Sequence, residues 1–237
     1  MTNFYRNKTC LITGATGGLG KELVGFLVNN HSILILVGQN KKKLIELKKK
    51  YDDNKNIYIY ASNFNDRKNI LATINKIKKN HNRVDILFNV AGIFSFKKIS
   101  KISIAEYDKI FNINFLAPLL FCKKFIYQMN KYRFGRIINI GSSSSYLGFK
   151  DTSLYCSSKH ALLGLTRSLQ DQYKNTNIKL YSFLPGSIKT KMGKKIKNQD
   201  YSTFIEPKEL AKFIVEMISL KGNININEIK ITREKIR

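Results

Sequence analysis

Short apolar runs alternate with longer helical patterns along this chain, and that alternation restricts the possible fold more than any other feature. Runs rich in Val, Ile and Leu are typical of parallel strands buried on both faces. Such runs stand at Thr9–Thr13, Ile33–Val37, Ile57–Tyr60, Val84–Asn89, Arg136–Ile140, Lys179–Phe183 and Ile226–Ile231. Helical stretches lie near Gly18–Asn29, Lys41–Lys50, Asp66–Asn80, Ala105–Arg133, Tyr155–Asn175 and Pro207–Leu220. This order predicts one α/β domain over residues 1–237, a doubly wound parallel sheet of about seven strands with helices on both faces.

Composition agrees with one folded domain in a reducing compartment. The 237 residues are 43% hydrophobic, which is enough for a sizeable core. Cys10, Cys122 and Cys156 are too few and too scattered for a disulfide framework, and the three histidines form no ligand pattern. No apolar run approaches the ~18 residues of a membrane span, and no signal peptide is visible. The sequence therefore predicts a cytoplasmic protein with no catalytic metal and no membrane partner.

The charge is strongly one-sided, because 42 Lys and Arg against 16 Asp and Glu give +26. Such a surplus fits nucleic-acid or anionic-membrane binding. It also fits an acidic substrate or carrier protein, or a general enrichment in Lys, Asn and Ile from biased codon usage. The lysines occur in every segment, and no Arg-rich run or basic–aromatic interleaving marks one face. We favour the compositional interpretation and predict no nucleic-acid partner.

A glycine-rich turn follows the first predicted strand. The segment T-G-A-T-G-G-L-G places Gly14, Gly18 and Gly20 between that strand and the next helix. In sheets of this kind, ligands bind beyond the carboxyl ends of the strands. Glycines there allow a tight turn and a close approach of the backbone to a pyrophosphate at the helix N-terminus. The turn indicates a dinucleotide site, although a plain strand–helix turn can have the same composition.

Tyr155 and Lys159, in Y-C-S-S-K, are four residues apart and would share one face of a helix. A phenol normally titrates near pH ~10 and is a poor acid–base catalyst at neutrality. A fixed cation beside it favours the phenolate and lowers its pKa, so the pair is suited to moving a proton. Alone, such a pair is more often a surface contact. The other motifs of the chain decide between the two interpretations.

Four motifs follow one another in a fixed order, each at the end of a predicted strand. They are T-G-x3-G-x-G from Thr13, N-x-A-G at Asn89–Gly92, a serine ahead of Y-x3-K, and P-G-x3-T at Pro185–Thr190. In this order the whole chain resembles the short-chain dehydrogenase/reductase family. The one departure in these segments is Val90, where the family usually has a second Asn. The resemblance implies a Rossmann-type fold and hydride transfer between a nicotinamide cofactor and a carbonyl/alcohol pair.

The resemblance also implies roles for individual residues. Ser142 donates a hydrogen bond to the carbonyl oxygen, and Tyr155 delivers or removes the proton. Lys159 lowers the pKa of the tyrosine and holds the nicotinamide ribose, while Asn114 anchors a water in the proton relay. The implied cofactor-binding residues are Gly14, Thr16, Gly18, Leu19, Gly20, Gln39, Asn63, Phe64, Asn89, Ala91, Gly92, Tyr155, Lys159, Pro185, Gly186, Ile188 and Thr190.

Two of these assignments depend on a choice between neighbours. The family places its serine thirteen residues before the tyrosine, which selects Ser142 and leaves Ser143 and Ser144 as runners-up. Asn114 is preferred to Asn112 because the family's asparagine precedes an apolar residue and a small one.

Cofactor preference depends on the residues that follow the second strand, Val37-Gly38-Gln39-Asn40-Lys41. Relatives that prefer NAD usually carry an Asp where Gly38 stands, which binds the ribose hydroxyls and repels a 2′-phosphate. Relatives that prefer NADP often carry an Arg where Gln39 stands. Without the carboxylate and with Lys41–Lys43 nearby, the sequence favours NADP, with NAD as the alternative.

Residues 191–206 resemble the variable segment that covers the substrate in the family. Here this flap is short, polar and basic, which fits an anionic substrate. The C-terminus lacks the glycine-rich ending common in carrier-protein ketoacyl reductases and looks more like the branch that reduces small 3-oxo or 3-hydroxy acids, aldehydes or ketones. We expect a small carbonyl or alcohol substrate, of the 3-oxo/3-hydroxy acid or acyl type. The alternatives are a catalytically silent scaffold or regulator of the same fold, and a basic nucleic-acid-binding protein.

Two helices are candidates for a subunit interface. In relatives, the helices that match Ala105–Arg133 and Tyr155–Asn175 often pack against their symmetry mates. The second carries a broad apolar surface at Ala161, Leu162, Leu165 and Leu169. The sequence therefore predicts a homodimer or homotetramer.

Overall fold

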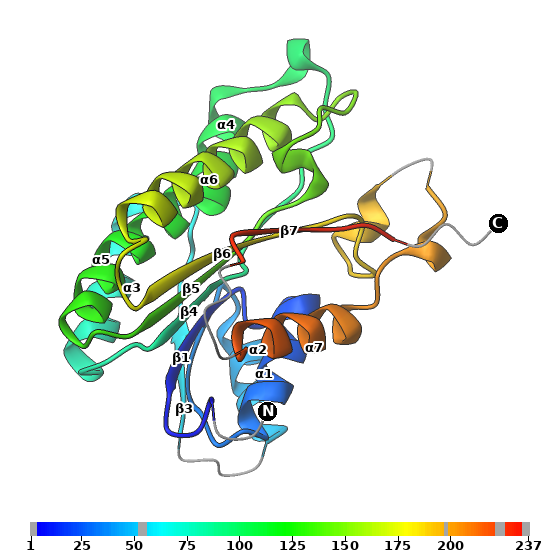
Figure 1. Ribbon diagram of the computed structural model, residues 1–237. Helices are drawn as coiled ribbons and strands as arrows, with labels where there is room; N and C mark the ends of the chain where they lie inside the picture. The colour runs from blue at the N-terminus through cyan, green and yellow to red at the C-terminus, as the bar shows by residue number, and fades with distance from the viewer. Residues whose placement is uncertain (1–3, 52–55, 197–198, 221–225, 234–237) are drawn as a thin grey trace.

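The computed structural model describes residues 4–51, 56–196, 199–220 and 226–233 (Figure 1). Its centre is a seven-stranded sheet in which every neighbouring pair is parallel, in the order β3-β2-β1-β4-β5-β6-β7. The strands are β1 (Thr9–Thr13), β2 (Ile33–Gly38), β3 (Ile57–Ala61), β4 (Ile86–Asn89), β5 (Gly135–Ile140), β6 (Ile178–Pro185) and β7 (Glu228–Ile231). This is the doubly wound fold that the alternating pattern predicts.

Helices cover both faces of the sheet (Figure 1). One apolar cluster joins α1 (Gly18–Val28), α2 (Lys41–Lys49) and α7 (Pro207–Ile218) to one face. A second joins α3 (Arg67–Asn80) and α5 (Ala117–Lys131) to the other, where α6 (Ser153–Gln172) also packs. Each cluster takes side chains from alternate positions of the central strands, such as Ile12 and Phe88 in the first and Leu11 and Leu87 in the second. Because both faces are covered, β1 and β4 are buried at every position.

The helix expected over Ala105–Arg133 is not regular. It consists of α4 (Ile104–Phe111), a π-helical turn at Asn112–Leu116 and α5. Single π-turns of this kind often occur at functional sites, and this one holds Asn114, whose side chain is completely buried. The last strand also differs from its prediction, because it begins at Glu228 rather than at Ile226.

By length and composition alone, the helical run Ile104–Lys131 could cross a membrane, because an 18-residue window within it has a mean hydropathy of 1.3. Many of its apolar side chains, such as Phe121 and Phe125, are instead buried against the sheet. Burying one such side chain stabilises a fold by about 1.5–3 kcal/mol. We therefore interpret the run as a core helix of the α/β domain.

The chain order reverses at β1, which pairs with β2 on one side and with β4 on the other. At such a switch point the connections leave in opposite directions and open a crevice beyond the carboxyl ends of the strands. The fold therefore places the glycine-rich turn after β1 and the Asn89–Gly92 segment after β4 at one crevice.

Candidate active site

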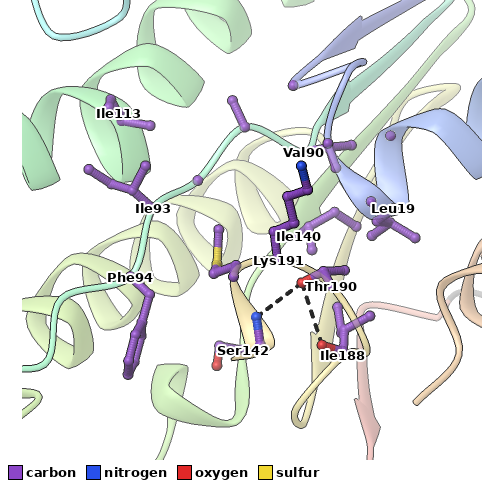
Figure 2. A pocket seen from close by; sticks show the side chains of 18 of the residues that line it. Leu19, Val90, Ile93, Phe94, Ile113, Ile140, Ser142, Ile188, Thr190 and Lys191 are labelled. Carbon is purple, nitrogen blue, oxygen red and sulfur yellow. Dashed lines mark hydrogen bonds between the residues drawn. The ribbon is translucent and has the colours of Figure 1, made fainter. Parts of the chain in front are cut away.

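A cavity of about 690 Å³ lies at the carboxyl ends of the strands and holds most of the residues that the sequence singles out. One end is lined by the glycine-rich turn and by the segments that follow β2 and β3. The other end is lined by Ser142 and Tyr155 and by six residues of two loops, Ile93, Phe94, Phe96, Phe149, Lys150 and Thr152. Figure 2 shows Leu19 on the first side and Phe94 and Ser142 on the second, with Thr190 between them. We call these ends the cofactor half and the substrate half.

The glycine-rich turn fits the close approach of another backbone. Gly14 has φ +68°, and a Cβ there would stand 2.7 Å from the backbone nitrogen of Ala91. A Cβ on Gly18 would stand 2.5 Å from the Thr190 side chain. The following helix, α1, begins without an acidic residue in its first turn, so its positive end faces the cavity without a competing anion. This cradle suits the pyrophosphate of a dinucleotide.

The adenine end of the cofactor half has no carboxylate where NAD-preferring relatives carry one. Gly38 occupies that position, and a Cβ there would lie 3.2 Å from Thr16 Oγ1. Gln39 and Lys43 line the cavity beside it. Asn40 fixes the start of α2, because its side chain accepts a hydrogen bond from the Lys43 backbone nitrogen at 3.0 Å. Lys43 is therefore held at the rim.

Two further predicted contacts lie at the end of β3. Asn63 and Phe64 both line the cavity. The Asn63 side chain accepts a hydrogen bond from the Asn65 backbone nitrogen at 3.1 Å, so it closes a local turn. The Phe64 ring is buried and lies 5.6 Å from the Phe121 ring.

Ser142 begins a short 3₁₀ turn, η3 (Ser143–Ser145), directly after β5. Its hydroxyl accepts a hydrogen bond from the Ser144 backbone nitrogen at 3.1 Å, while the Ser145 hydroxyl accepts one from the Ser142 nitrogen at 3.1 Å. This reciprocal capping fixes Ser142. Ser143 and Ser144 also line the cavity, but Ser142 is the serine whose hydroxyl influences the Tyr155 phenol.

The expected lowering of the Tyr155 pKa is wrong for the described structure. Burial raises the pKa of Tyr155 to about 12, and the Ser142 hydroxyl offsets only part of that rise. Burial likewise lowers the pKa of Lys159 to about 8. The Lys159 ammonium donates to the Ile140 carbonyl at 2.9 Å and lies 5.9 Å from the centre of the Tyr155 ring. Desolvation therefore dominates the pKa of Tyr155, and the phenol is neutral and able to donate a proton.

Asn114 does not line the cavity, but its side chain forms hydrogen bonds to Ile93, which does. Its side-chain oxygen accepts from the Ile93 backbone nitrogen at 2.9 Å, and its amide donates to the Ile93 carbonyl and the Ser158 hydroxyl, each at 3.0 Å. The Ser158 hydroxyl in turn donates to the Tyr155 carbonyl at 2.8 Å. Asn114 thus ties the loop after β4 to the helix of Tyr155. Asn112, the less favoured candidate, instead donates to the Asn65 carbonyl at 2.8 Å.

Asn89 also lies outside the cavity lining. Its side-chain amide donates to the Asn139 side-chain oxygen at 2.8 Å and to the Cys122 sulfur at 3.5 Å, so it joins β4 to β5 and α5. The next residues along, Ala91 and Gly92, do reach the cavity. The N-x-A-G segment is therefore divided between the sheet and the site.

The loop after β6 closes the cavity between its two halves. Pro185, Gly186, Ile188 and Thr190 all line it. The Thr190 hydroxyl donates to the Ile188 carbonyl at 3.5 Å and accepts from the Gly193 nitrogen at 3.1 Å (Figure 2). Residues 197–198 of the predicted flap lie outside the described residues. The flap returns to the body at a parallel bridge between Ile188 and Ile205.

Several residues of the substrate half escaped the sequence analysis. Phe94, Phe96, Phe149 and Lys150 line it, and the Phe94 ring stands edge-on to the Tyr155 ring at 4.9 Å. They lie in loops just after N-x-A-G and just before Y-x3-K, and that position is the only indication that the sequence offers. Among the described residues, no cluster of His, Cys, Asp or Glu could hold a metal ion.

Comparison with known proteins agrees with this geometry. A family model described as short chain dehydrogenase matches residues 8–201. The chain belongs to the short-chain dehydrogenase family. It is therefore an oxidoreductase that acts on CH–OH groups and binds a nicotinamide cofactor.

Individual relatives cover most of the chain. A 3-oxoacyl-(acyl-carrier-protein) reductase of Rickettsia conorii is 33% identical over 199 residues, 84% of this chain and 80% of that protein. Among solved structures, an alcohol dehydrogenase of Thermococcus sibiricus complexed with 5-hydroxy-NADP has a TM-score of 0.85 at 19% identity, covering 95% of this chain and 96% of that one. ElxO with NADP bound has a TM-score of 0.82 at 27% identity, covering 95% and 97%.

Proposed function

We propose that this short-chain dehydrogenase interconverts a carbonyl and a secondary alcohol, with Tyr155 as the general acid and base. The observation that carries the proposal is the shared cavity, where Ser142, Tyr155 and Lys159 line the same space as the glycine-rich turn. Tyr155 and Lys159 are both almost completely buried, so a proton there exchanges within the site rather than with bulk water.

In the reductive direction, a reduced nicotinamide held in the cofactor half would supply the hydride that the carbonyl carbon accepts. Ser142 donates a hydrogen bond to the carbonyl oxygen and orients it. Tyr155, neutral because its pKa is about 12, transfers its phenolic proton to that oxygen as negative charge develops there. Lys159 stabilises the resulting tyrosinate electrostatically and holds the nicotinamide ribose. Asn114 keeps the Ile93 loop and α6 in register, which fixes the distance across the site.

We propose NADP as the preferred cofactor. The support is the missing carboxylate at Gly38, Lys43 at the rim of the adenine end, and the NADP bound to the relative ElxO.

Replacing Lys43 by Met should weaken NADPH binding about tenfold, since a charge-assisted contact to a phosphate contributes about 1.5–3 kcal/mol. NADH binding should be unchanged. The matched control is Lys42→Met, on the same helix but outside the cavity. Tighter binding of NADH than of NADPH by the unmodified protein, in a fluorescence titration, would contradict the preference.

We propose a substrate of the 3-oxo or 3-hydroxy acyl type. Its support is the 33% identity to a 3-oxoacyl-(acyl-carrier-protein) reductase, together with the apolar walls Phe94, Phe96 and Phe149.

We also propose a homodimer or homotetramer through α4, α5 and α6, where Tyr107 and Tyr127 expose 44% and 77% of their surface. Light scattering during size-exclusion chromatography measures that state directly, and a monomeric mass would contradict it.

One experiment tests the reaction itself. The protein is offered a panel of ketones, aldehydes and 3-oxo esters with NADPH or NADH, and matching alcohols with NADP⁺ or NAD⁺, and absorbance at the reduced-nicotinamide band is followed. Turnover that requires Tyr155 supports the proposal. Tight cofactor binding with no turnover across the panel would instead identify a silent scaffold.

A further inference from the structure

The described residues that line the substrate half give it apolar walls and a positive charge, and none of them carries a carboxylate. Three aromatic side chains line it, from Phe94, Phe96 and Phe149. Among the described residues that line the cavity, Glu46 is the only acidic one, and it lies on α2 beside the cofactor half. A site with this composition favours a ligand that is apolar along its length and negatively charged at one place.

Two lysines that directly adjoin cavity-lining residues are already paired. Lys97 binds Glu106 at 2.6 Å, and Lys189 binds Glu206 at 2.5 Å. Lys150 and Lys191 line the cavity, and neither forms an ion pair with any residue that the structure describes. Lys191 directly follows Thr190, at the boundary with the cofactor half (Figure 2). Lys150 lies on the loop between the turn of Ser142 and the helix of Tyr155, so it belongs to the substrate half.

The backbone around Lys150 is held in place. The next residue, Asp151, has φ +58°, and its carbonyl accepts a hydrogen bond from the Lys97 nitrogen at 2.6 Å. The Thr152 hydroxyl donates to the Phe149 carbonyl at 2.8 Å. These bonds close a tight turn immediately before α6. The backbone of Lys150 is therefore fixed by hydrogen bonds of the residues before and after it, although its side chain is exposed.

The chain also limits how far Lys150 lies from the reacting group. Lys150 precedes Tyr155 by five positions, and five fully extended residues span at most about 17 Å. The last of them are helical and span less. The Cα of Lys150 therefore lies within about 17 Å of the Tyr155 Cα.

From this arrangement we infer that the substrate carries an anionic group remote from its carbonyl, and that Lys150 is the residue that binds it. The apolar part between the two groups lies against Phe94, Phe96 and Phe149. This inference rests on the proposed function and narrows it, because it favours a carbonyl on an alkyl or aryl body that ends in a carboxylate over a neutral ketone. Lys150 is then a specificity-determining residue and takes no part in the proton transfer.

The test uses redox-inert ligands, so that it does not depend on turnover. 4-Phenylbutanoate and the neutral 4-phenylbutanamide are titrated calorimetrically into the NADP⁺-saturated protein. The carboxylate should bind about tenfold more tightly than the amide, as expected for one partly exposed charge-assisted contact. Lys150→Met should remove that difference without changing the affinity for the amide, and Lys150→Arg should restore most of it. Lys49→Met, which removes an equal charge from the far end of α2, should change neither affinity.

Each other result overturns the inference. Equal binding of the two ligands, or no binding of either, shows that the substrate half selects no anion. An equal loss in Lys150→Met and Lys49→Met assigns the preference to the overall charge of +26. A loss in Lys191→Met with none in Lys150→Met places the anion at the cofactor boundary. The ketone panel, with Tyr155→Phe as its control, reports separately whether the proposed reaction takes place.

Discussion

The two halves of the cavity are built in different ways. The cofactor half consists largely of backbone, with Gly14 held at φ +68° and with no room for a Cβ against Ala91. The substrate half consists of side chains on loops, including Phe94, Phe149 and Lys150. Backbone geometry requires particular residue types at particular spacings, whereas an apolar wall can be made by many side chains. The comparison explains why one half has a recognisable sequence and the other does not.

The largest effect should come from the point where the halves meet. Tyr155→Phe removes the phenolic proton donor and should lower kcat by about 10³-fold, within the usual range for the loss of a general acid. NADPH affinity should remain within about twofold, because the ring and its contact with Phe94 are retained. Initial rates and a fluorescence titration on one preparation measure both quantities. If cofactor binding falls while turnover persists, the division into two halves is wrong.

Particular residues show which features of the fold and the site the sequence predicts. The sheet follows from runs such as Thr9–Thr13 and Ile33–Val37, and the spacing of the motifs brings Gly14, Ser142 and Tyr155 to one cavity. The cofactor contact expected of Asn89 could not be tested from sequence alone, because its side-chain amide forms a hydrogen bond between β4 and β5. No local sequence pattern reveals which side chain of a motif faces the site. The pKa of Tyr155 could not be predicted either. Helical spacing predicts a nearby cation, but it gives no information about the burial that raises the pKa.

A second prediction tests the cofactor half. Gly14→Ala introduces a Cβ at a left-handed φ and 2.7 Å from the Ala91 nitrogen, so the loop after β4 must move. NADPH should bind about ten- to a hundredfold more weakly, and the protein should lose about 1–2 kcal/mol of stability from the backbone conformation alone. Fluorescence titration and urea unfolding measure these changes.

The matched control is Gly164→Ala. Gly164 lies within α6, and a Cβ there meets nothing within 4 Å. This variant should bind NADPH normally and gain up to about 1 kcal/mol, since Ala is the better helix former. Normal NADPH binding by Gly14→Ala would show that the turn does not form the cofactor cradle.

The third prediction concerns pH. Burial lowers the pKa of Lys159 to about 8, whereas Tyr155 stays neutral up to about 12. The reductive kcat/KM should therefore fall about tenfold per pH unit above pH 8, as Lys159 loses its proton. Lys159→Arg, whose side chain stays protonated, should lack this basic limb even if its activity is lower. A limb that appears only above pH 10 would assign the titration to another group.

Stability should show the opposite dependence on the same group. The folded pKa of Lys159, about 8, lies below the unfolded value of about 10.4, so the unfolded state binds more protons between these two values. Charging Lys159 in the folded protein is therefore unfavourable, and the free energy of unfolding should gain a positive contribution as pH rises through this window. The difference between the unmodified protein and Lys159→Met in urea unfolding, measured at pH 7 and pH 10, isolates this contribution.

The smallest effect should come from the aromatic wall. Phe94→Leu keeps an apolar side chain but removes the edge-on contact with the Tyr155 ring. Such contacts contribute about 0.5–1.5 kcal/mol, so kcat/KM should fall about two- to tenfold, with NADPH affinity unchanged. Phe213→Leu, which removes an edge-on contact with Phe183 outside the cavity lining, should leave kcat/KM unaltered. Equal losses of kcat/KM in both variants would show that Phe94 contributes only to packing.

The central claim is that the two halves form one site, with the nicotinamide ring beside Tyr155. A crystal structure of the NADP⁺ complex tests it most directly. Our account predicts the pyrophosphate at the turn of Gly14 and Gly18, and the nicotinamide facing Ser142 and Tyr155 with room for one carbonyl group between them. A nicotinamide that leaves the cavity before reaching Tyr155, or a Tyr155 side chain directed away from it, would contradict the account.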